Sequence, residues 1–313
     1  MQYGSIPGVA LPVARIILGS MVCTTDAMEA TRALLDAYVQ AGGNAIDTAH
    51  LYHGGKSERA IGQWMQERGN RDRIVLITKG AHPTDAGPRV TPGDITQDLT
   101  ESLDRLQTDR IDIYLLHRDD ENVPVEPIIE CLNQHCAEGR IVIFGASNWS
   151  TARIDAANAY ARQQGLRGFS VSSPHFSLAL TNEPVWAGCV TLDDAGRQWH
   201  RQNQMPLLPW SAQARGFFTG RFTPDDTSSE HMVRVYYNDT NWERYRRAQE
   251  LALQKGCDAR HIALAYVLAE PYPVFALIGP ATIAELQDSL RALDVALSPR
   301  ERAYLELRAD LPA

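Results

Sequence analysis

Four residues that can hold or donate a proton stand close to the ends of apolar runs. Asp47, Lys79 and His117 each end such a run, and Tyr52 follows Asp47 by five residues. A phenol alone, with a pKa of about 10, is a poor acid at neutral pH. A lysine ammonium beside it stabilises the phenolate, and a carboxylate can hold that lysine. Proton donors without a nucleophile indicate general acid catalysis on a carbonyl oxygen, where Tyr52 and His117 would support the developing negative charge.

These side chains can meet only in a fold that gathers the strand ends. Eight short runs of strand character alternate with segments in which apolar residues return every three or four positions. This alternation predicts parallel strands covered on both faces by crossover helices. Eight units predict a (β/α)₈ barrel with its active site at the C-terminal mouth. The runs are 14–19, 44–47, 73–79, 111–117, 140–148, 168–173, 205–210 and 273–279, and the clearest helical segments are 28–43, 57–69 and 91–107.

We expect one domain over residues 1–313, with residues 211–241 forming an active-site and cofactor loop after the seventh strand. The part from 219 to 241 is polar and too long for a simple connection, which is typical of a lid or a disordered loop. Ser298 with Glu301 predicts a capping box that begins an extra C-terminal helix, and Thr282 with Glu285 predicts another.

Composition favours a soluble protein with a small-molecule partner. Of 313 residues, 44% are hydrophobic and 22% charged, and no apolar run is long enough to cross a membrane. The N-terminus lacks the pattern of an export signal, and the five cysteines form no CxxC pair, so we expect free thiols in the cytoplasm. A net charge of −8 opposes nucleic-acid binding. The sequence gives no indication of an oligomeric state.

Five motifs together resemble the aldo-keto reductase superfamily: "GGNAIDTAHLY", the "TK" that ends the third run, "YLLH", "GASNW" and "PWSAQARGFFTG". The resemblance extends from Arg15 to about Leu297. It implies an NAD(P)H-dependent oxidoreductase that reduces an aldehyde or ketone to an alcohol by hydride transfer. In this family pattern Tyr52 is the general acid, Lys79 and Asp47 tune it, and His117 orients the carbonyl.

The resemblance also implies a cofactor site. Ser147 and Asn148 would hold the nicotinamide carboxamide, although both could instead cap the helix that begins near Thr151. Trp210 would stack on the nicotinamide, and Ser211 with the loop after it would contact the pyrophosphate. Where many members have glutamine and tyrosine after strand six, this chain has Ser173 and Phe176. The expected cofactor residues are Ser20, Met21, Asp47, Ser147, Asn148, Ser173, Trp210, Ser211, Gln213, Arg215, Gly216, Gly279, Thr282, Glu285 and Ser289.

The segment after strand eight bears on the choice between NADH and NADPH. Members that prefer NADPH commonly have Lys or Arg here to meet the 2′-phosphate, whereas this chain has Ala281 and, in the first helical turn, Glu285. A helix N-terminus attracts anions, but without a cation a 2′-phosphate gains little. We therefore predict that NADH serves at least as well as NADPH. Glu285 could instead act only in the capping box.

The substrate side is expected to be mixed in character, which favours a small polar carbonyl compound or a sugar aldehyde. Two other readings remain open. One is a metal-dependent barrel hydrolase using His50, His53 or His82, although the first strand lacks the HxH pair of such enzymes and no metal is expected. The other is a nucleotide-binding regulatory module like the channel β subunits of the same superfamily. The expected substrate residues are Val22, Cys23, His53, Trp149, His175 and Tyr236.

Overall fold

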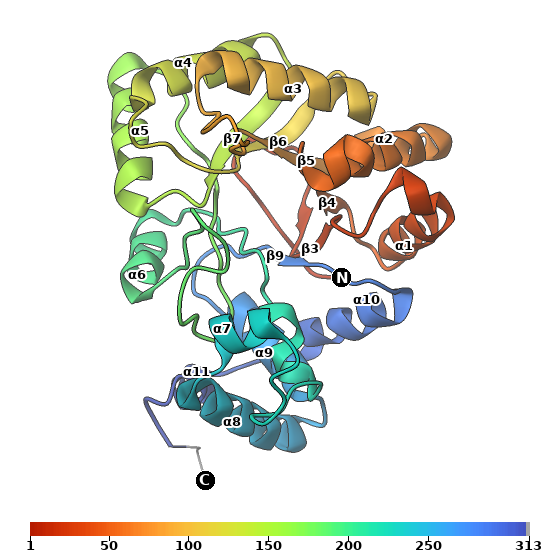
Figure 1. The fold of residues 1–313 in the computed structure, drawn as a ribbon, viewed down its shortest axis with the longest axis vertical. Coiled ribbons are helices and arrows are strands. Elements are labelled where there is room, and N and C mark those ends of the chain that lie inside the picture. Colours follow the sequence, from red (N-terminus) through yellow and green to blue (C-terminus); the bar gives the residue numbers. More distant parts are fainter. Residues whose placement is uncertain (311–313) are drawn as a thin grey trace.

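The computed structural model of the protein describes residues 1–310 and has parallel strands at its centre with helices around them (Figure 1). Seven strands pair in the order β8-β7-β6-β5-β4-β3-β9. The segment 205–210 completes the ring, because Leu207 bridges in parallel both to Ser172 of β8 and to Val274, just before β9. The strands are β3 (Ile16–Gly19), β4 (Ala45–Asp47), β5 (Val75–Gly80), β6 (Ile111–Leu116), β7 (Ile141–Ser147), β8 (Ser172–Ser173) and β9 (Ala276–Ile278).

Helices follow the strands along the chain and surround them. In Figure 1, α1 to α5 succeed one another around the upper half of the barrel, while α8 and α11 lie at the bottom, near the C-terminus. Cap side chains accept backbone N–H groups at many of the starts, as Thr91, Ser150 and Asp193 do before α3, α5 and α6. The helices are α1 (Met28–Gln40), α2 (Lys56–Arg68), α3 (Pro92–Leu106), α4 (Val125–Ala137), α5 (Thr151–Gln164), α6 (Asp194–Asn203), α7 (Glu230–Tyr236), α8 (Asp239–Lys255), α9 (Ala259–Leu268), α10 (Ile283–Leu290) and α11 (Pro299–Leu305).

Two hydrophobic cores result from covering both faces of the strands. Inward side chains such as Ile77 and Leu115 fill the barrel, and outward ones such as Leu76 and Leu116 pack under the helices. A short antiparallel hairpin, β1 (Tyr3–Gly4) with β2 (Val13–Ala14), precedes β3 and adds Val13 to the inner core. The barrel interior is therefore a packed core, and a ligand must bind at its rim.

The predicted (β/α)₈ barrel is confirmed. The seventh run forms bridges instead of a regular strand, and the polar segment after it contains α7, which the sequence did not predict. The capping box at Ser298 and Glu301 is present, with α11 beginning at Pro299. At α10 only half of the predicted box forms, because the Glu285 carboxylate accepts from the N–H of Ala281 and not of Thr282.

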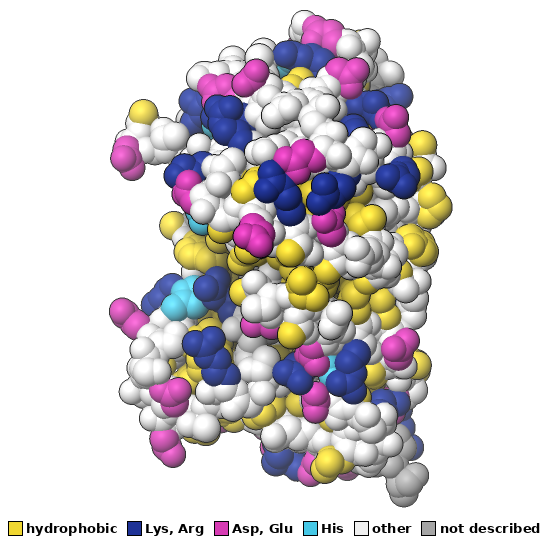
Figure 2. Space-filling view, turned by 90° about the vertical axis from the view of Figure 1, so that its right-hand side faces the viewer, with side chains coloured by type: hydrophobic (Ala, Val, Ile, Leu, Met, Phe, Trp, Pro, Cys, Tyr) yellow, Lys and Arg dark blue, Asp and Glu magenta, His cyan; other side chains and the backbone are white. Residues whose placement is uncertain are grey.

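No helix among residues 1–310 is long and apolar enough to cross a membrane. On the face shown in Figure 2, basic and acidic side chains are intermixed and hydrophobic side chains gather across the middle. The single domain over residues 1–313 stays a prediction, and its last three residues lie outside the described part of the chain.

Candidate active site

Strand register brings three of the four predicted catalytic residues to one edge of the barrel. Asp47 ends β4 opposite Ile77 of β5, and Lys79 lies opposite Leu115 of β6. His117 follows β6 directly, and its backbone N–H donates to Gly80 at 2.8 Å. Parallel strands thus end at the same rim, where three ionisable side chains that are far apart in the sequence become neighbours.

A tight turn returns Tyr52 to the same rim. The 3₁₀ turn η2 (Tyr52–Gly55) curls through left-handed conformations at Gly54 and Gly55, which glycine adopts without a steric penalty. The Lys79 ammonium donates to the Asp47 carboxylate at 2.6 Å and to the Tyr52 hydroxyl at 3.4 Å. The short strand ending in Asp47 is thereby linked through one lysine to the phenol that follows it.

The charges of this group are balanced. Burial raises the pKa of Asp47 and outweighs the opposing effect of Lys79. Burial opposes the charge on Lys79, but the contacts with Asp47 and Tyr52 together raise its pKa above the ordinary value. The buried ammonium therefore stays protonated at neutral pH.

Two opposing effects set the pKa of Tyr52. Lys79 lowers it, as expected, but burial of the phenol has a larger effect, so the net pKa is above the usual value. The predicted effect of Lys79 on the phenol is therefore present, and burial of the phenol outweighs it. A phenol of this kind keeps its proton at neutral pH, as a general acid must.

His117 is a neutral imidazole at the same rim. Its side chain is buried, and burial, followed by the nearby Lys79 and Arg118, lowers its pKa well below 6.5. The rings of Tyr52 and His82 approach it with centroids 6.0 and 5.0 Å away. A neutral imidazole beside a protonated phenol can donate a hydrogen bond to a carbonyl oxygen without competing for its proton.

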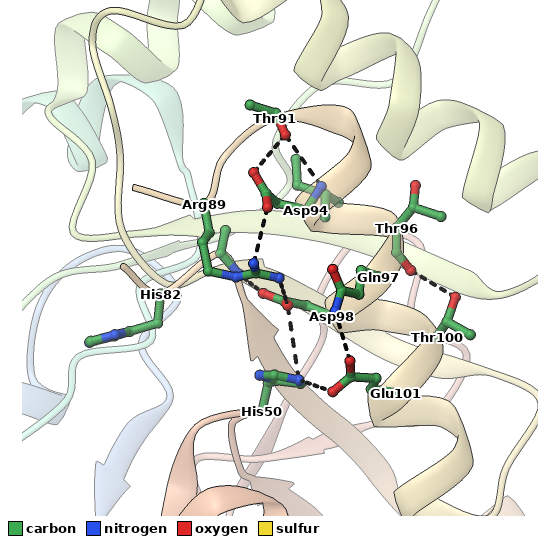
Figure 3. A network of polar contacts seen from close by, with 12 residues as sticks. His50, His82, Arg89, Thr91, Asp94, Thr96, Gln97, Asp98, Thr100 and Glu101 are labelled. Carbon is green, nitrogen blue, oxygen red and sulfur yellow. Dashed lines mark hydrogen bonds and ion pairs between the residues drawn. The ribbon is translucent and has the colours of Figure 1, made fainter. Parts of the chain in front are cut away.

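Charged side chains of α3 bond to the segments that carry Tyr52 and His82 and form a network with them (Figure 3). Asp98 accepts from the backbone N–H of Ala81 at 2.8 Å and pairs with Arg89 at 2.5 Å. His50, two residues before Tyr52, bonds to Glu101 at 2.8 Å. The loops after β4 and β5 are therefore both tied to one helix, which limits movement of the rim.

The four predicted catalytic residues line one end of an elongated cavity of about 750 Å³. Its wall continues past the loop after strand seven to α10. The predicted cofactor and substrate residues that line it, besides the four, are Ser20, Met21, Val22, Ser147, Asn148, Trp210, Ser211, Gln213, Arg215, Gly216, Gly279, Glu285 and Ser289.

Ser147 and Asn148 do not cap the following helix, because Ser150 does so. Asn148 adopts a left-handed conformation, and its amide donates to the carbonyl of His117 at 3.2 Å. The Trp210 indole N–H donates to the Asn148 side-chain oxygen at 3.2 Å. Asn148 therefore connects the rim at His117 to the indole, and Ser147 donates to the carbonyl of Ser173, which leaves the helix-cap alternative without support.

The far end of the cavity is acidic. Glu285 is exposed there, and Asp288 lies one turn further along α10. Arg260 also lines this end, but it already contacts Asp288 and Asp258, each at 2.8 Å. Gln213 bonds to Ser289 at 3.1 Å and joins the loop after strand seven to α10. This end thus offers the exposed Glu285 carboxylate and a guanidinium, Arg260, whose charge is already offset by Asp258 and Asp288.

Several predicted ligand contacts do not line the cavity. His175 is fully buried and bonds to the Tyr236 hydroxyl at 3.1 Å, and burial lowers its pKa to about 4. Burial raises the pKa of Cys23 to about 12. A strand-end position alone does not distinguish a side chain that faces the cavity from one that packs behind it. The predicted residues outside the cavity wall are Cys23, His53, Trp149, Ser173, His175, Tyr236 and Thr282.

Other lining residues were missed. Arg118 follows His117, so extending each strand end by one residue would have found it. Trp186 stacks at 5.6 Å on Trp210 and lies under Arg215, so it links two loops at the mouth. It belongs to a loop without a periodic pattern, and nothing in the sequence signals it. The missed lining residues also include Cys189, Thr219, Arg221, Arg260 and Asp288.

The histidines that suggested a hydrolase lie in separate contacts. His53 bonds to the carbonyl of Met21 and His82 to that of Pro83, while His50 belongs to the α3 network. Within residues 1–310, the one group with metal-ligand spacing is Asp258, His261 and Asp288. Arg260 contacts both of its carboxylates, which accounts for their proximity.

Known proteins resemble this chain in sequence and in fold. The Aldo/keto reductase family model matches residues 15–307. Norsolorinic acid reductase of Aspergillus flavus is 32% identical over 86% of this chain and 68% of its own length. An NADP(+) aryl-alcohol dehydrogenase of Phanerodontia chrysosporium is 28% identical over 96% and 83%. The crystal structure of a thermostable aldo-keto reductase with the inhibitor epalrestat superposes with a TM-score of 0.77 and 21% identity, covering 99% of this chain and 100% of that one, which shows a common fold.

The barrel and the cavity at its rim are those of a (β/α)₈ enzyme with its site at the C-terminal mouth. The chain belongs to the aldo/keto reductase family. It is an enzyme of that family, which uses nicotinamide cofactors and acts on small-molecule carbonyl compounds.

Proposed function

We propose that this enzyme reduces the carbonyl group of a small polar aldehyde or ketone to an alcohol, with Tyr52 as the general acid. The observation that carries the proposal is the position of the Lys79 ammonium, 2.6 Å from Asp47 and 3.4 Å from the Tyr52 hydroxyl at the cavity wall. Tyr52 donates its proton to the carbonyl oxygen, and the ammonium stabilises the phenolate that remains. His117, neutral and beside Tyr52, donates a hydrogen bond to the same oxygen.

The residues of the cavity fit a nicotinamide dinucleotide. Trp210 lines the cavity near the rim. Arg215 and Arg221 line it too and have no carboxylate within 4.0 Å in residues 1–310, so their charges are available to a diphosphate. When bound, the cofactor supplies the hydride. Ser147 and Asn148 would hold its carboxamide, and Gln213, Arg215 and Gly216 would hold its phosphates.

NADH is proposed to serve at least as well as NADPH. A 2′-phosphate at the far end would meet the exposed Glu285 carboxylate, while Arg260 is already paired with Asp258 and Asp288. A free cation would be needed to offset that repulsion. The ribose of NADH carries no such charge. The aryl-alcohol dehydrogenase of Phanerodontia chrysosporium is named for NADP(+), so the proposed preference would separate this enzyme from that relative.

A carbonyl screen tests the proposal. Aldehydes, ketones and aldoses are offered with NADH and NADPH in parallel, and kcat/KM is measured for each pair. Tyr52→Phe should lower kcat/KM for reduction by about 10²–10⁴ while cofactor binding, followed by fluorescence titration, persists.

Loss of cofactor binding in Tyr52→Phe, or reduction at the wild-type rate, would contradict the role of Tyr52. A hundredfold preference for NADPH would contradict the cofactor proposal. Binding of the cofactor without steady-state turnover of any carbonyl would favour the regulatory-module alternative.

A further inference from the structure

We infer that the substrate of this site carries a carboxylate, which the Arg118 guanidinium binds while the carbonyl group faces Tyr52 and His117. The inference rests on the proposed function and adds the chemical class of the substrate. Arg118 lines the cavity directly after His117 and is only 8% exposed.

The backbone that carries Arg118 is held in place from several sides. The Trp149 indole N–H donates to the carbonyl of Arg118 at 3.1 Å, and the Asn148 amide donates to the carbonyl of His117 at 3.2 Å. The aliphatic part of Arg118 lies beside Gly188, where an added Cβ would approach its Cδ to 3.4 Å. The backbone and the aliphatic part of Arg118 therefore hold the guanidinium in one position.

The charge of this guanidinium is not balanced by the protein. No carboxylate of residues 1–310 lies within 4.0 Å of it, although Asp119 is the next residue, because Asp119 pairs with Arg153 at 3.1 Å. Its one hydrogen bond to the described residues goes from Nη1 to the carbonyl of His117, at 2.9 Å. Arginine has five N–H donors in a planar fork, so most of them remain available to a ligand.

The neighbouring cation has the opposite arrangement. The Lys79 ammonium is neutralised by Asp47, so the catalytic group carries no net charge and Arg118 leaves one unmatched positive charge beside it. Burying a charge is unfavourable unless a partner compensates it. A bidentate carboxylate matches the geometry of the guanidinium and would supply that partner.

Arg118 comes from a different loop than the cations proposed for the diphosphate, and it shares the carbonyl of His117 with Asn148, which is proposed to hold the nicotinamide carboxamide. The exposed cations available for a diphosphate, Arg215 and Arg221, belong to the loop after strand seven, whereas Arg118 lies beside the residue that receives the carbonyl oxygen. Trp186 and Cys189 complete the lining near the loop that contains Gly188. The guanidinium therefore faces the space left for the substrate.

Matched acid and amide substrates test the inference. Purified enzyme at saturating NADH is assayed with 4-carboxybenzaldehyde against 4-formylbenzamide, and with succinic semialdehyde against N,N-dimethyl-4-oxobutanamide, whose tertiary amide cannot cyclise onto the aldehyde. In at least one pair the wild type should show a kcat/KM at least about tenfold higher for the acid. Arg118→Met should reduce this acid-to-amide ratio by about 10- to 100-fold, and Arg118→Lys should retain part of it.

Arg201→Met is the matched control, because Arg201 is an exposed cation on α6 and its loss should leave the ratio unchanged. Acid-to-amide ratios near one in the wild type, for both pairs, would overturn the inference without any variant. Equal losses for acid and amide in a folded Arg118→Met protein would overturn it as well, as would a loss confined to cofactor binding. Failure of the wild type to reduce either amide or acid would instead count against the proposed function.

Discussion

The two ends of the cavity hold their charges in different ways. At the rim, Lys79 and Asp47 are both nearly inaccessible to solvent and each offsets the other. At the far end Glu285 is exposed and Arg260 is shared between two carboxylates. The buried end can tune a proton donor because few water molecules screen its charges, whereas the outer end can only favour or disfavour a ligand of a given charge.

The largest expected effect comes from breaking the buried pair. Lys79→Met leaves the Asp47 carboxylate buried without its cation, so we expect the free energy of unfolding to fall by about 3–5 kcal/mol. Urea denaturation at neutral pH measures it. Combining Lys79→Met with Asp47→Asn removes both charges and should recover much of the loss. A single variant as stable as the wild type would show that the pair is not held as described.

The support behind the rim should matter next. Asp98→Ala removes the acceptor of the buried Ala81 N–H and one of the two carboxylates that pair with Arg89, and we expect the free energy of unfolding to fall by about 1.5–3 kcal/mol, mainly because the Ala81 N–H loses its acceptor. The control is Asp109→Ala, an exposed carboxylate before β6. Equal stability of the two variants would mean that the α3 network does not hold the loop after β5.

At the outer end of the cavity we expect a smaller effect, on the choice between NADPH and NADH. Glu285→Arg replaces a repelling carboxylate by a cation that can pair with a 2′-phosphate, so the ratio of kcat/KM for NADPH to that for NADH should rise about tenfold or more. The free energy of unfolding should fall by less than about 1 kcal/mol, since the exposed Glu285 carboxylate accepts only the Ala281 N–H at the start of α10. A ratio that does not move would place the 2′ position of the ribose elsewhere.

The smallest effect concerns pH. His117 has a lowered pKa and stays neutral above it, and Tyr52 has a raised pKa and stays protonated below it. The rate of carbonyl reduction should therefore not reflect the ionisation of either group between about pH 6.5 and 9.5. An ordinary histidine or tyrosine would begin to titrate at the ends of this range. A rate that changes tenfold near pH 6.5, and no longer does so in His117→Gln, would contradict this.

Much of the barrel rim follows from sequence reasoning, because apolar runs identify the strands and the strand ends share one edge. Asp47, Lys79 and His117 could be predicted to meet for that reason, and Tyr52 because it follows a strand by only a few residues. The direction in which a side chain points after the end of a strand could not be predicted. His175 and Tyr236 bond to each other behind the wall, and only tertiary packing determines that.

Residues that come from irregular segments could not be predicted in the same way. Trp186 reaches the mouth from a loop, and Arg260 reaches the outer end from α9, where its helical position suggests an ordinary surface arginine. The net pKa of Tyr52 also needed coordinates, since burial and the nearby lysine act in opposite directions and only their sum sets the sign.

The most direct test of the central claim is the ionisation of the Tyr52 phenol, followed by ¹³C-tyrosine NMR and assigned with Tyr52→Phe. We expect the phenol to titrate above the ordinary value of about 10, and higher still in Lys79→Met, because the ammonium lowers its pKa against the effect of burial. A Tyr52 that ionises below that value, or whose titration is the same with and without Lys79, would contradict the account.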